Sequence, residues 1–96
     1  MLVLVAYDIS TLSSDGRKRL RLAAKACENY GLRVQHSVFE CHLDNTQYRA
    51  LQRQLENIIN IEEDSVRFYN LGNSYDRKTL HIGTKAIIDI NDPIIL

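Results

Sequence analysis

One carboxylate ends the first apolar run of the chain. Asp8 directly follows residues 2–7, a near-continuous apolar segment that predicts a central strand covered on both faces. Its side chain could cap a helix, close a turn or hold a hard cation. The Ser, Ser and Asp at positions 13–15 are better placed to cap the helix that follows. Tyr7 points to the opposite face, as a core residue or as a group that positions or stacks on a base.

A cation site of this kind needs a second copy of the chain. Mg²⁺ commonly binds one or two carboxylates and keeps several waters. One aspartate per chain makes a poor site, whereas two copies facing each other across a two-fold axis would make an adequate one. His36, His42 and His81 lack metal-binding spacing, and Cys27 and Cys41 form no CxxC pair. We interpret them as structural histidines and as buried, reduced thiols.

A cluster of basic residues lies between positions 16 and 27, with no acidic residue among them. Its members are Arg17, Lys18, Arg19, Arg21 and Lys25. On a helix, Arg17 and Arg21 fall beside one edge of the apolar stripe and Arg19 falls near the other. The cluster is either a solvated face or a surface for phosphates. The chain has 12 basic and 12 acidic residues, which argues against a generic nucleic-acid coat, so the cluster is a local basic patch.

The elements that position these residues follow a βαββαβ order. The helix at 16–30 shows apolar residues at three- and four-residue steps, and Gly31 is placed to end it in a left-handed conformation. Residues 32–43 are one long kinked strand or, as suits a small sheet better, two strands that bend near His36 and Ser37. In order, the segments are a strand at 2–7, a helix at 16–30, a strand pair within 32–43, a helix after caps at 44–46, and a strand at 66–71.

The C-terminal part predicts further strands. Residues 72–74 form a turn, 79–82 a hairpin partner for the preceding strand, and 86–96 a strand extension. The fold class is therefore α/β (α+β), a ferredoxin-like sandwich with additional C-terminal strands in a single domain of residues 1–96. We expect both helices on one face of the sheet. The other face, which should carry Phe39, needs a cover that a second protomer could supply, so we expect a homodimer.

No segment of the chain predicts a membrane partner. No apolar run approaches the roughly 18 residues that span a bilayer. The apolar N-terminus lacks a basic leader and is too short for the core of a signal peptide. We therefore expect a soluble, cytoplasmic protein.

Three stretches resemble the CRISPR-associated Cas-two family. They are "VAYDIS" at residues 5–10, "DGRKR" at 15–19 and "YGLRVQHSVFE" at 30–40. The G-x-R-V-Q-x-S-V-F-E run is the specific one, and the resemblance covers nearly the whole chain in order. These proteins are small, ferredoxin-like and encoded beside the CRISPR integrase. The resemblance implies a homodimer whose Asp8 residues face each other, with the strand at 86–90 packed on the partner protomer.

Two functions follow from this resemblance. One is a metal-dependent endonuclease that cleaves RNA or double-stranded DNA, with one Mg²⁺ or Mn²⁺ between two Asp8 carboxylates and with basic side chains on the phosphates. The other is a non-catalytic scaffold that, with CRISPR integrase dimers at each end, captures new spacer DNA. The functional positions of the family fall on Tyr7, Asp8, Arg17, Arg19, Arg33 and Phe39, and the basic helix adds Arg21.

Overall fold

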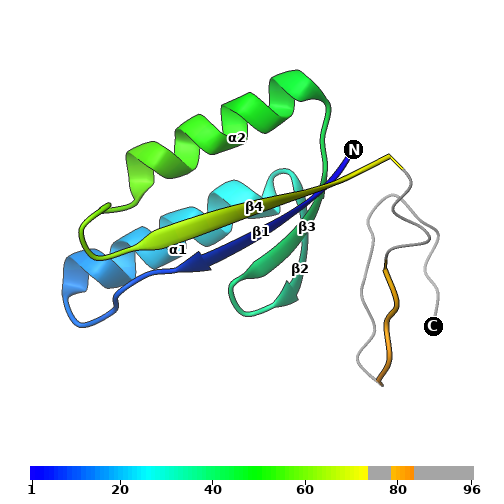
Figure 1. Ribbon diagram of the computed structural model, residues 1–96. Coiled ribbons are helices and arrows are strands. Elements are labelled where there is room, and N and C mark those ends of the chain that lie inside the picture. Colours follow the sequence, from blue (N-terminus) through cyan, green and yellow to red (C-terminus); the bar gives the residue numbers. More distant parts are fainter. Residues whose placement is uncertain (74–78, 84–96) are drawn as a thin grey trace.

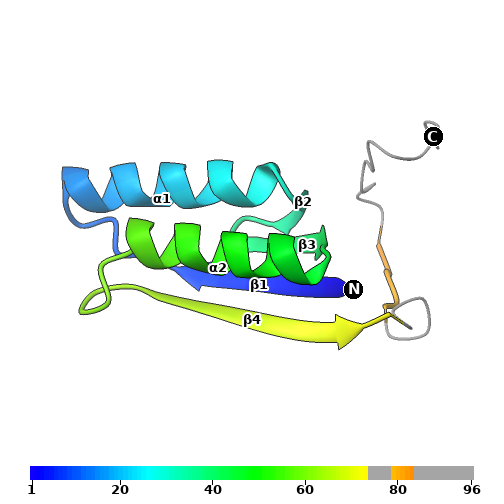
Figure 2. The same cartoon turned by 90° about the horizontal axis from the view of Figure 1, so that it is seen from above.

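The computed structural model describes residues 1–73 and 79–83 of the chain and shows a helix layer on a sheet (Figures 1 and 2). Within these residues, four strands form one sheet in the order β2-β3-β1-β4, and every neighbouring pair is antiparallel. The predicted ferredoxin-like βαββαβ order is confirmed. The elements are β1 (Leu2–Asp8), α1 (Ser14–Glu28), β2 (Gly31–Gln35), β3 (Val38–His42), α2 (Asn45–Ile58) and β4 (Ser65–Gly72).

The core lies between the sheet and the two helices. Alternate side chains of β1, Val3, Val5 and Tyr7, are buried there. Phe39 lies opposite Val5 in the antiparallel ladder and is completely buried in the same core. The expectation that Phe39 lies on the other face of the sheet is therefore wrong. The register of the β1–β3 pairing determines the face of the sheet on which Phe39 lies, because directly paired residues of neighbouring strands share a face.

Both helices begin at capped residues. The Ser13 hydroxyl accepts a hydrogen bond of 3.0 Å from the Gly16 backbone N–H, so α1 starts two residues before the predicted position. Asp44 and Gln47 form a reciprocal capping box at the start of α2, where the sequence placed the cap. These caps determine the residue at which each helix begins.

Gly31 has a different role from the predicted one. It does not end α1 in a left-handed conformation; α1 ends at Glu28, and Gly31 is the first residue of β2. A Cβ at this position would run into the Glu40 carbonyl oxygen and would lie 2.7 Å from Cys41 Cα. Glycine is needed here because β2 and β3 approach closely, not because of its backbone angle.

The segment 32–43 divides as the preferred interpretation has it, with a turn at His36 and Ser37 between β2 and β3. The predicted hairpin partner at 79–82 is wrong, because these residues form no strand. A four-residue alternation is too short to determine a pairing. The predicted extension at 86–96 lies outside the described residues. Across 1–73 and 79–83, no helix is long and apolar enough to cross a membrane.

The second face of the sheet bears no helix from the described part of the chain (Figure 2). Ala6, Val38 and Tyr69 belong to this face by register, and Tyr69 remains 42% exposed. Asp8 belongs to it as well, because side chains alternate along β1 and Asp8 is two residues beyond Ala6. The acidic end of β1 is thus on the uncovered face.

Candidate metal and nucleic-acid site

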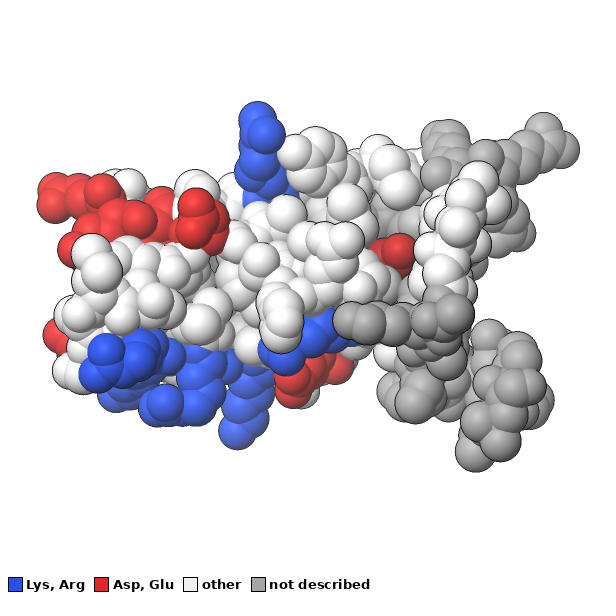
Figure 3. Space-filling view, turned by 90° about the horizontal axis from the view of Figure 1, so that it is seen from below, with Lys and Arg blue, Asp and Glu red and all other residues white. Residues whose placement is uncertain are grey.

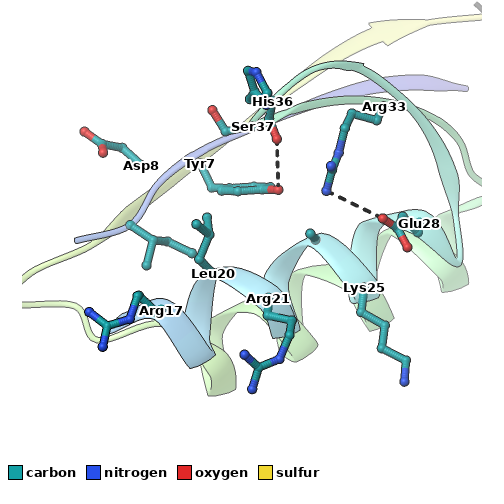
Figure 4. A pocket seen from close by; sticks show the side chains of 12 residues that line it. Tyr7, Asp8, Arg17, Leu20, Arg21, Lys25, Glu28, Arg33, His36 and Ser37 are labelled. Carbon is teal, nitrogen blue, oxygen red and sulfur yellow. Dashed lines mark hydrogen bonds and ion pairs between the residues drawn. The ribbon is translucent and has the colours of Figure 1, made fainter. Parts of the chain in front are cut away.

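Asp8 is an exposed carboxylate at the end of a rigid strand. It is the last residue of β1 and lies opposite Ser65 of β4. Among the described residues its side chain makes no hydrogen bond or ion pair. The carboxylate therefore neither caps α1 nor closes a turn. In Figure 4 it points away from the Tyr7 ring.

The donor set at Asp8 fits a hard cation only in part. A carboxylate oxygen is a ligand that Mg²⁺ and Mn²⁺ accept. However, residues 1–73 and 79–83 contain no group of three or more His, Cys, Asp or Glu side chains that could hold an ion. A cation held by Asp8 would therefore need further ligands from water, substrate or a second copy of the chain.

A cleft of about 670 Å³ lies between α1, the end of β1 and the β2–β3 turn (Figure 4). Apolar side chains of Ile9, Leu20 and Ala24 form part of its wall, and charged groups surround them. The cleft is lined by Tyr7, Asp8, Ile9, Arg17, Leu20, Arg21, Ala24, Lys25, Glu28, Arg33, His36 and Ser37. The structure thus brings five of the predicted site residues together: Tyr7, Asp8, Arg17, Arg21 and Arg33.

Three cations of α1 follow one edge of this cleft. Arg17, Arg21 and Lys25 are spaced by four residues, about 6 Å along a helix. Arg17 donates a long hydrogen bond of 3.4 Å to the Thr11 carbonyl, whereas Arg21 and Lys25 have no ion-pair partner among the described residues. Figure 3 shows Lys and Arg side chains gathered along one edge of the molecule. We call Arg17, Arg21 and Lys25 the cation ladder.

Arg33 enters the cleft from β2 and is held in place on two sides. Its guanidinium lies 3.5 Å from a Glu28 carboxylate oxygen and 5.2 Å from the centre of the Phe39 ring. Phe39 stacks in turn on Tyr7, with ring centres 6.2 Å apart. Phe39 therefore acts from within the core, as a support for Arg33 and Tyr7 rather than as a surface residue.

The Tyr7 hydroxyl lies at the inner end of the cleft. The residue is 4% exposed, and its hydroxyl is 3.5 Å from the His36 carbonyl oxygen, at the long limit of a hydrogen bond. Burial raises the pKa of Tyr7 above its ordinary value, although nearby Arg33 opposes this shift. The phenol is therefore protonated at neutral pH, and its O–H is the donor in the contact with the His36 carbonyl.

Arg19 does not line the cleft. Its Nε donates to Asp64 Oδ2 at 2.8 Å, and a terminal nitrogen lies 3.1 Å from Glu63 Oε2. The arginine holds the α2–β4 turn against α1. Arg19 thus lies apart from the cation ladder, and its predicted contact with phosphates stays a prediction.

Asp64 is a buried carboxylate near the site that sequence reasoning missed. Its side chain is fully buried and accepts from Arg19, from the Ser10 N–H at 3.0 Å and from the Asn60 N–H at 2.9 Å. Burial alone would raise the pKa of Asp64, but these hydrogen bonds outweigh it and lower the pKa. We call Asp64 and these three partners the Asp64 clamp. It ties the loop that follows Asp8 to the α2–β4 turn.

Comparison with known proteins gives one consistent family. The family model described as "CRISPR associated protein Cas2" matches residues 1–79. A CRISPR-associated endonuclease Cas2 of Halalkalibacterium halodurans is 56% identical over 95 residues, which cover 99% of each chain. A CRISPR-associated endoribonuclease Cas2 of Rhodospirillum rubrum is 46% identical over 95 residues, 99% of this chain and 100% of the relative.

A solved structure agrees with these matches. The crystal structure of Streptococcus pyogenes Cas2 at pH 6.5 superposes with a TM-score of 0.76 and 46% identity, and the match covers 86% of this chain and 100% of that one. The resemblance carried by residues 30–40 is therefore confirmed along nearly the whole chain. By family model, sequence identity and fold, this protein belongs to the CRISPR-associated Cas2 family.

Proposed function

We propose that the protein is a homodimeric, metal-dependent endonuclease of the spacer-acquisition stage of CRISPR defence, which hydrolyses phosphodiester bonds of RNA or double-stranded DNA. The observation that carries this proposal is the unpaired Asp8 carboxylate at the end of β1, beside a cleft lined by cations. The names of the relatives, endonuclease and endoribonuclease, support the same chemistry.

The helix-free face of the sheet supports the pairing of two chains. Asp8 lies on this face together with Ala6 and Val38. If two copies meet there, their Asp8 carboxylates can approach each other while both α1 helices stay accessible. Each chain then supplies the ligand that the other lacks, as a two-fold axis requires.

In this proposal, Asp8 and the basic residues have different roles. Asp8 and its counterpart in the second chain would hold one Mg²⁺ or Mn²⁺. When bound, such an ion offsets phosphate charge and lowers the pKa of a coordinated water. The cation ladder binds the flanking phosphates, and Arg33 adds a further positive charge at the inner end of the cleft. The rigid end of β1 keeps the carboxylate in position relative to these groups.

Replacement of Asp8 tests the enzyme directly. We expect Asp8→Asn to reduce cleavage of RNA and duplex DNA at least about 100-fold in Mg²⁺, as for the loss of an electrostatic group on a reacting phosphate. EDTA should reduce cleavage by the parent protein to the same level. The exposed Asp8 side chain makes no hydrogen bond or ion pair among the described residues, so its replacement should leave the thermal unfolding midpoint unchanged. Glu56→Gln, an exposed charge change on α2, is the matched control, and equal cleavage by the Asp8 variant would reject the proposal.

A non-catalytic scaffold is the second candidate, and a specific observation favours it. Among the described residues, no group of three or more His, Cys, Asp or Glu side chains could hold a metal ion, and the Glu28 carboxylate in the cleft is paired with Arg33. In this role the cation ladder would hold a DNA duplex by its backbone, and the dimer would bridge CRISPR integrase dimers. Spacer acquisition in cells separates the two functions. Normal acquisition with Asp8→Asn, together with unchanged duplex binding, would favour the scaffold.

Both functions require the cation ladder to bind phosphates. We expect Arg17→Ala combined with Arg21→Ala to weaken duplex binding and to reduce the slope of log K against log salt by about 2, since each lost phosphate contact removes about 0.9. Titrations by fluorescence anisotropy at several salt concentrations measure this slope. Arg49→Ala with Arg53→Ala is the matched control, because these exposed arginines have the same spacing on α2. A slope equal to that of the parent would show that the phosphates bind elsewhere.

A further inference from the structure

We propose that Asp64 is a positioning residue for Asp8: through the Asp64 clamp it fixes the end of β1, and with it the place of the exposed carboxylate. This inference rests on the proposed role of Asp8 as a metal ligand and adds the residue that holds it in position. Asp64 is not among the residues that line the cleft. It therefore acts on Asp8 through the backbone, not by touching substrate or metal.

The place of the Asp8 carboxylate depends on the backbone that carries it. The side chain is exposed and makes no hydrogen bond or ion pair among the described residues. A ligand must lie within about 0.5 Å of its productive position, and metal-binding side chains usually have a neighbour that orients them. Because the described residues provide no such neighbour for Asp8, the strand end must supply the orientation.

This strand end is a place where a sheet would ordinarily open. Asp8 is the last residue of β1 and pairs with Ser65, the first residue of β4. The ends of secondary-structure elements open most readily. The loop that follows β1 and the α2–β4 turn that precedes β4 lie at the same end of the molecule (Figures 1 and 2). A bond between these two segments would keep the terminal pair closed.

Asp64 makes this bond. Its Oδ1 accepts from the Ser10 N–H at 3.0 Å, two residues beyond the end of β1. Its Oδ2 accepts from the Asn60 N–H at 2.9 Å and from Arg19 Nε at 2.8 Å. The side chain is fully buried, so water does not compete for these hydrogen bonds. The clamp thus closes the β1–β4 pair from outside, one residue before β4 begins.

The loop after Asp8 is also held from its other side. Ser10 lies against the first turn of α1, because a Cβ on Gly16 would run into the Ser10 carbonyl oxygen. Ile9, between Asp8 and Ser10, is buried in the core. The N–H of Ser10 is bound to Asp64, its carbonyl meets α1, and the residue before it is packed. The backbone of Asp8 therefore has little freedom while the clamp is intact.

The same geometry gives Arg19 a role in the site although it lies outside the cleft. Its terminal nitrogen contacts Glu63 at 3.1 Å, and its Nε holds Asp64. A buried carboxylate needs an opposite charge and several donors to remain in place. Arg19 supplies that charge, so its loss should act on Asp8 through Asp64.

Asp64→Asn tests the inference by removing one acceptor at nearly constant size. An amide has a single acceptor oxygen, so it cannot serve the donors on both sides. We expect kcat for cleavage in Mg²⁺ to fall about tenfold, the lower end of what loss of an orienting partner costs. KM should not change, because the cation ladder is intact.

Two controls separate positioning from stability and from charge. Leu51→Ala should lower stability as well, since Leu51 is fully buried on α2, but it leaves the clamp intact. Glu63→Gln makes the same chemical change on the half-exposed neighbour of Asp64. Both should keep the kcat of the parent at a temperature where all variants are folded.

A second measurement follows the position of Asp8 without activity or metal. Backbone ¹⁵N relaxation of the metal-free protein gives an order parameter for Asp8. We expect about 0.85 in the parent and in Leu51→Ala, and a decrease toward about 0.6 in Asp64→Asn. A purely global loss of stability would not produce this local change.

Arg19→Lys keeps the test valid if Asp64→Asn does not fold. Lysine retains the charge but not the planar fork that reaches both Asp64 and Glu63. We expect kcat to fall about threefold, as for one lost hydrogen bond in the clamp. A lysine would serve equally well as a charge beside a phosphate, so parental kcat in Arg19→Lys would overturn the inference.

Failure of the inference differs from failure of the proposed function. If the parent cleaves and Asp64→Asn matches Leu51→Ala in kcat and in the order parameter of Asp8, Asp64 has a structural role only. An equal fall of kcat in both variants would assign the loss to stability. If the parent itself shows no cleavage that depends on Asp8, the proposed function is wrong and this inference is rejected with it.

Discussion

We expect Asp64→Ala to lower the free energy of unfolding by about 3 kcal/mol. This is the largest effect on stability that we predict for a single side chain. Asp64 is fully buried and accepts hydrogen bonds from Arg19 and from the backbone N–H groups of Ser10 and Asn60. Alanine leaves these donors without their acceptor. The cost is high because the two backbone groups belong to different loops, which the clamp holds together. Chemical denaturation of the parent and the variant measures the difference.

Glu63→Ala is the matched control for this prediction. Glu63 contacts the same arginine from the same turn, but its side chain is about half exposed. An exposed ion pair contributes only about 0–1 kcal/mol. We therefore expect a small change for Glu63→Ala. If the two variants lose equal stability, the buried hydrogen bonds of Asp64 are not what holds the loops.

The lowered pKa of Asp64 gives the same clamp a pH dependence. A carboxyl whose pKa is lower in the folded than in the unfolded protein stabilises the fold above the unfolded value, near 3.8, and loses this contribution as the pH falls. The difference in unfolding free energy between the parent and Asp64→Asn should therefore shrink on acidification below about pH 4. A constant difference down to the folded-state pKa would contradict the assigned ionised state.

Gly16→Ala is expected to destabilise the protein by about 1–3 kcal/mol, the usual cost of an overpacked site. On helix propensity alone, alanine would stabilise a helix by up to about 1 kcal/mol relative to glycine. Here a Cβ would run into the Ser10 carbonyl oxygen and lie 3.0 Å from the Ser10 carbonyl carbon. Ser10 cannot move freely, because its N–H is bound to Asp64. The steric term therefore outweighs propensity and reverses the sign.

Asn57→Ala tests helix propensity without this collision. Asn57 is exposed in α2, where alanine should stabilise the helix by a few tenths of a kcal/mol. Thermal unfolding should thus shift in opposite directions for the two variants. An increase in stability for Gly16→Ala would show that the β1–α1 loop can move away from the helix, and the clamp would then not be rigid.

Much of the fold could be predicted from local patterns. The apolar steps of α1 and α2 and the break at His36 and Ser37 are local, so the sequence indicated them. Phe39 was assigned to the wrong face because its side depends on the pairing with β1, which periodicity within one strand does not determine. The contact between α1 and the α2–β4 turn could not be predicted for the same reason, because it depends on which distant segments pack together.

In the candidate site, too, local patterns could be predicted and long-range contacts could not. Helical rotation alone separated Arg17 and Arg21 from Arg19, and the structure keeps that separation. What the sequence could not show was the neighbour on each side. Asp64 is 45 residues from Arg19, and within three consecutive acidic residues nothing local marks it as the buried one. Long-range packing therefore decided which acidic residue pairs with Arg19.

The uneven placement of charge should orient the protein as it approaches a charged partner. The chain is neutral overall, yet basic side chains gather along one edge of the surface and acidic ones along another (Figure 3). Such a separation of charge gives the described part of the molecule an electric dipole, on which the field of a polyanion would exert a torque at a distance. A net-neutral protein would then arrive at a nucleic acid already turned with α1 forward, and added salt would slow this alignment before it weakens any contact.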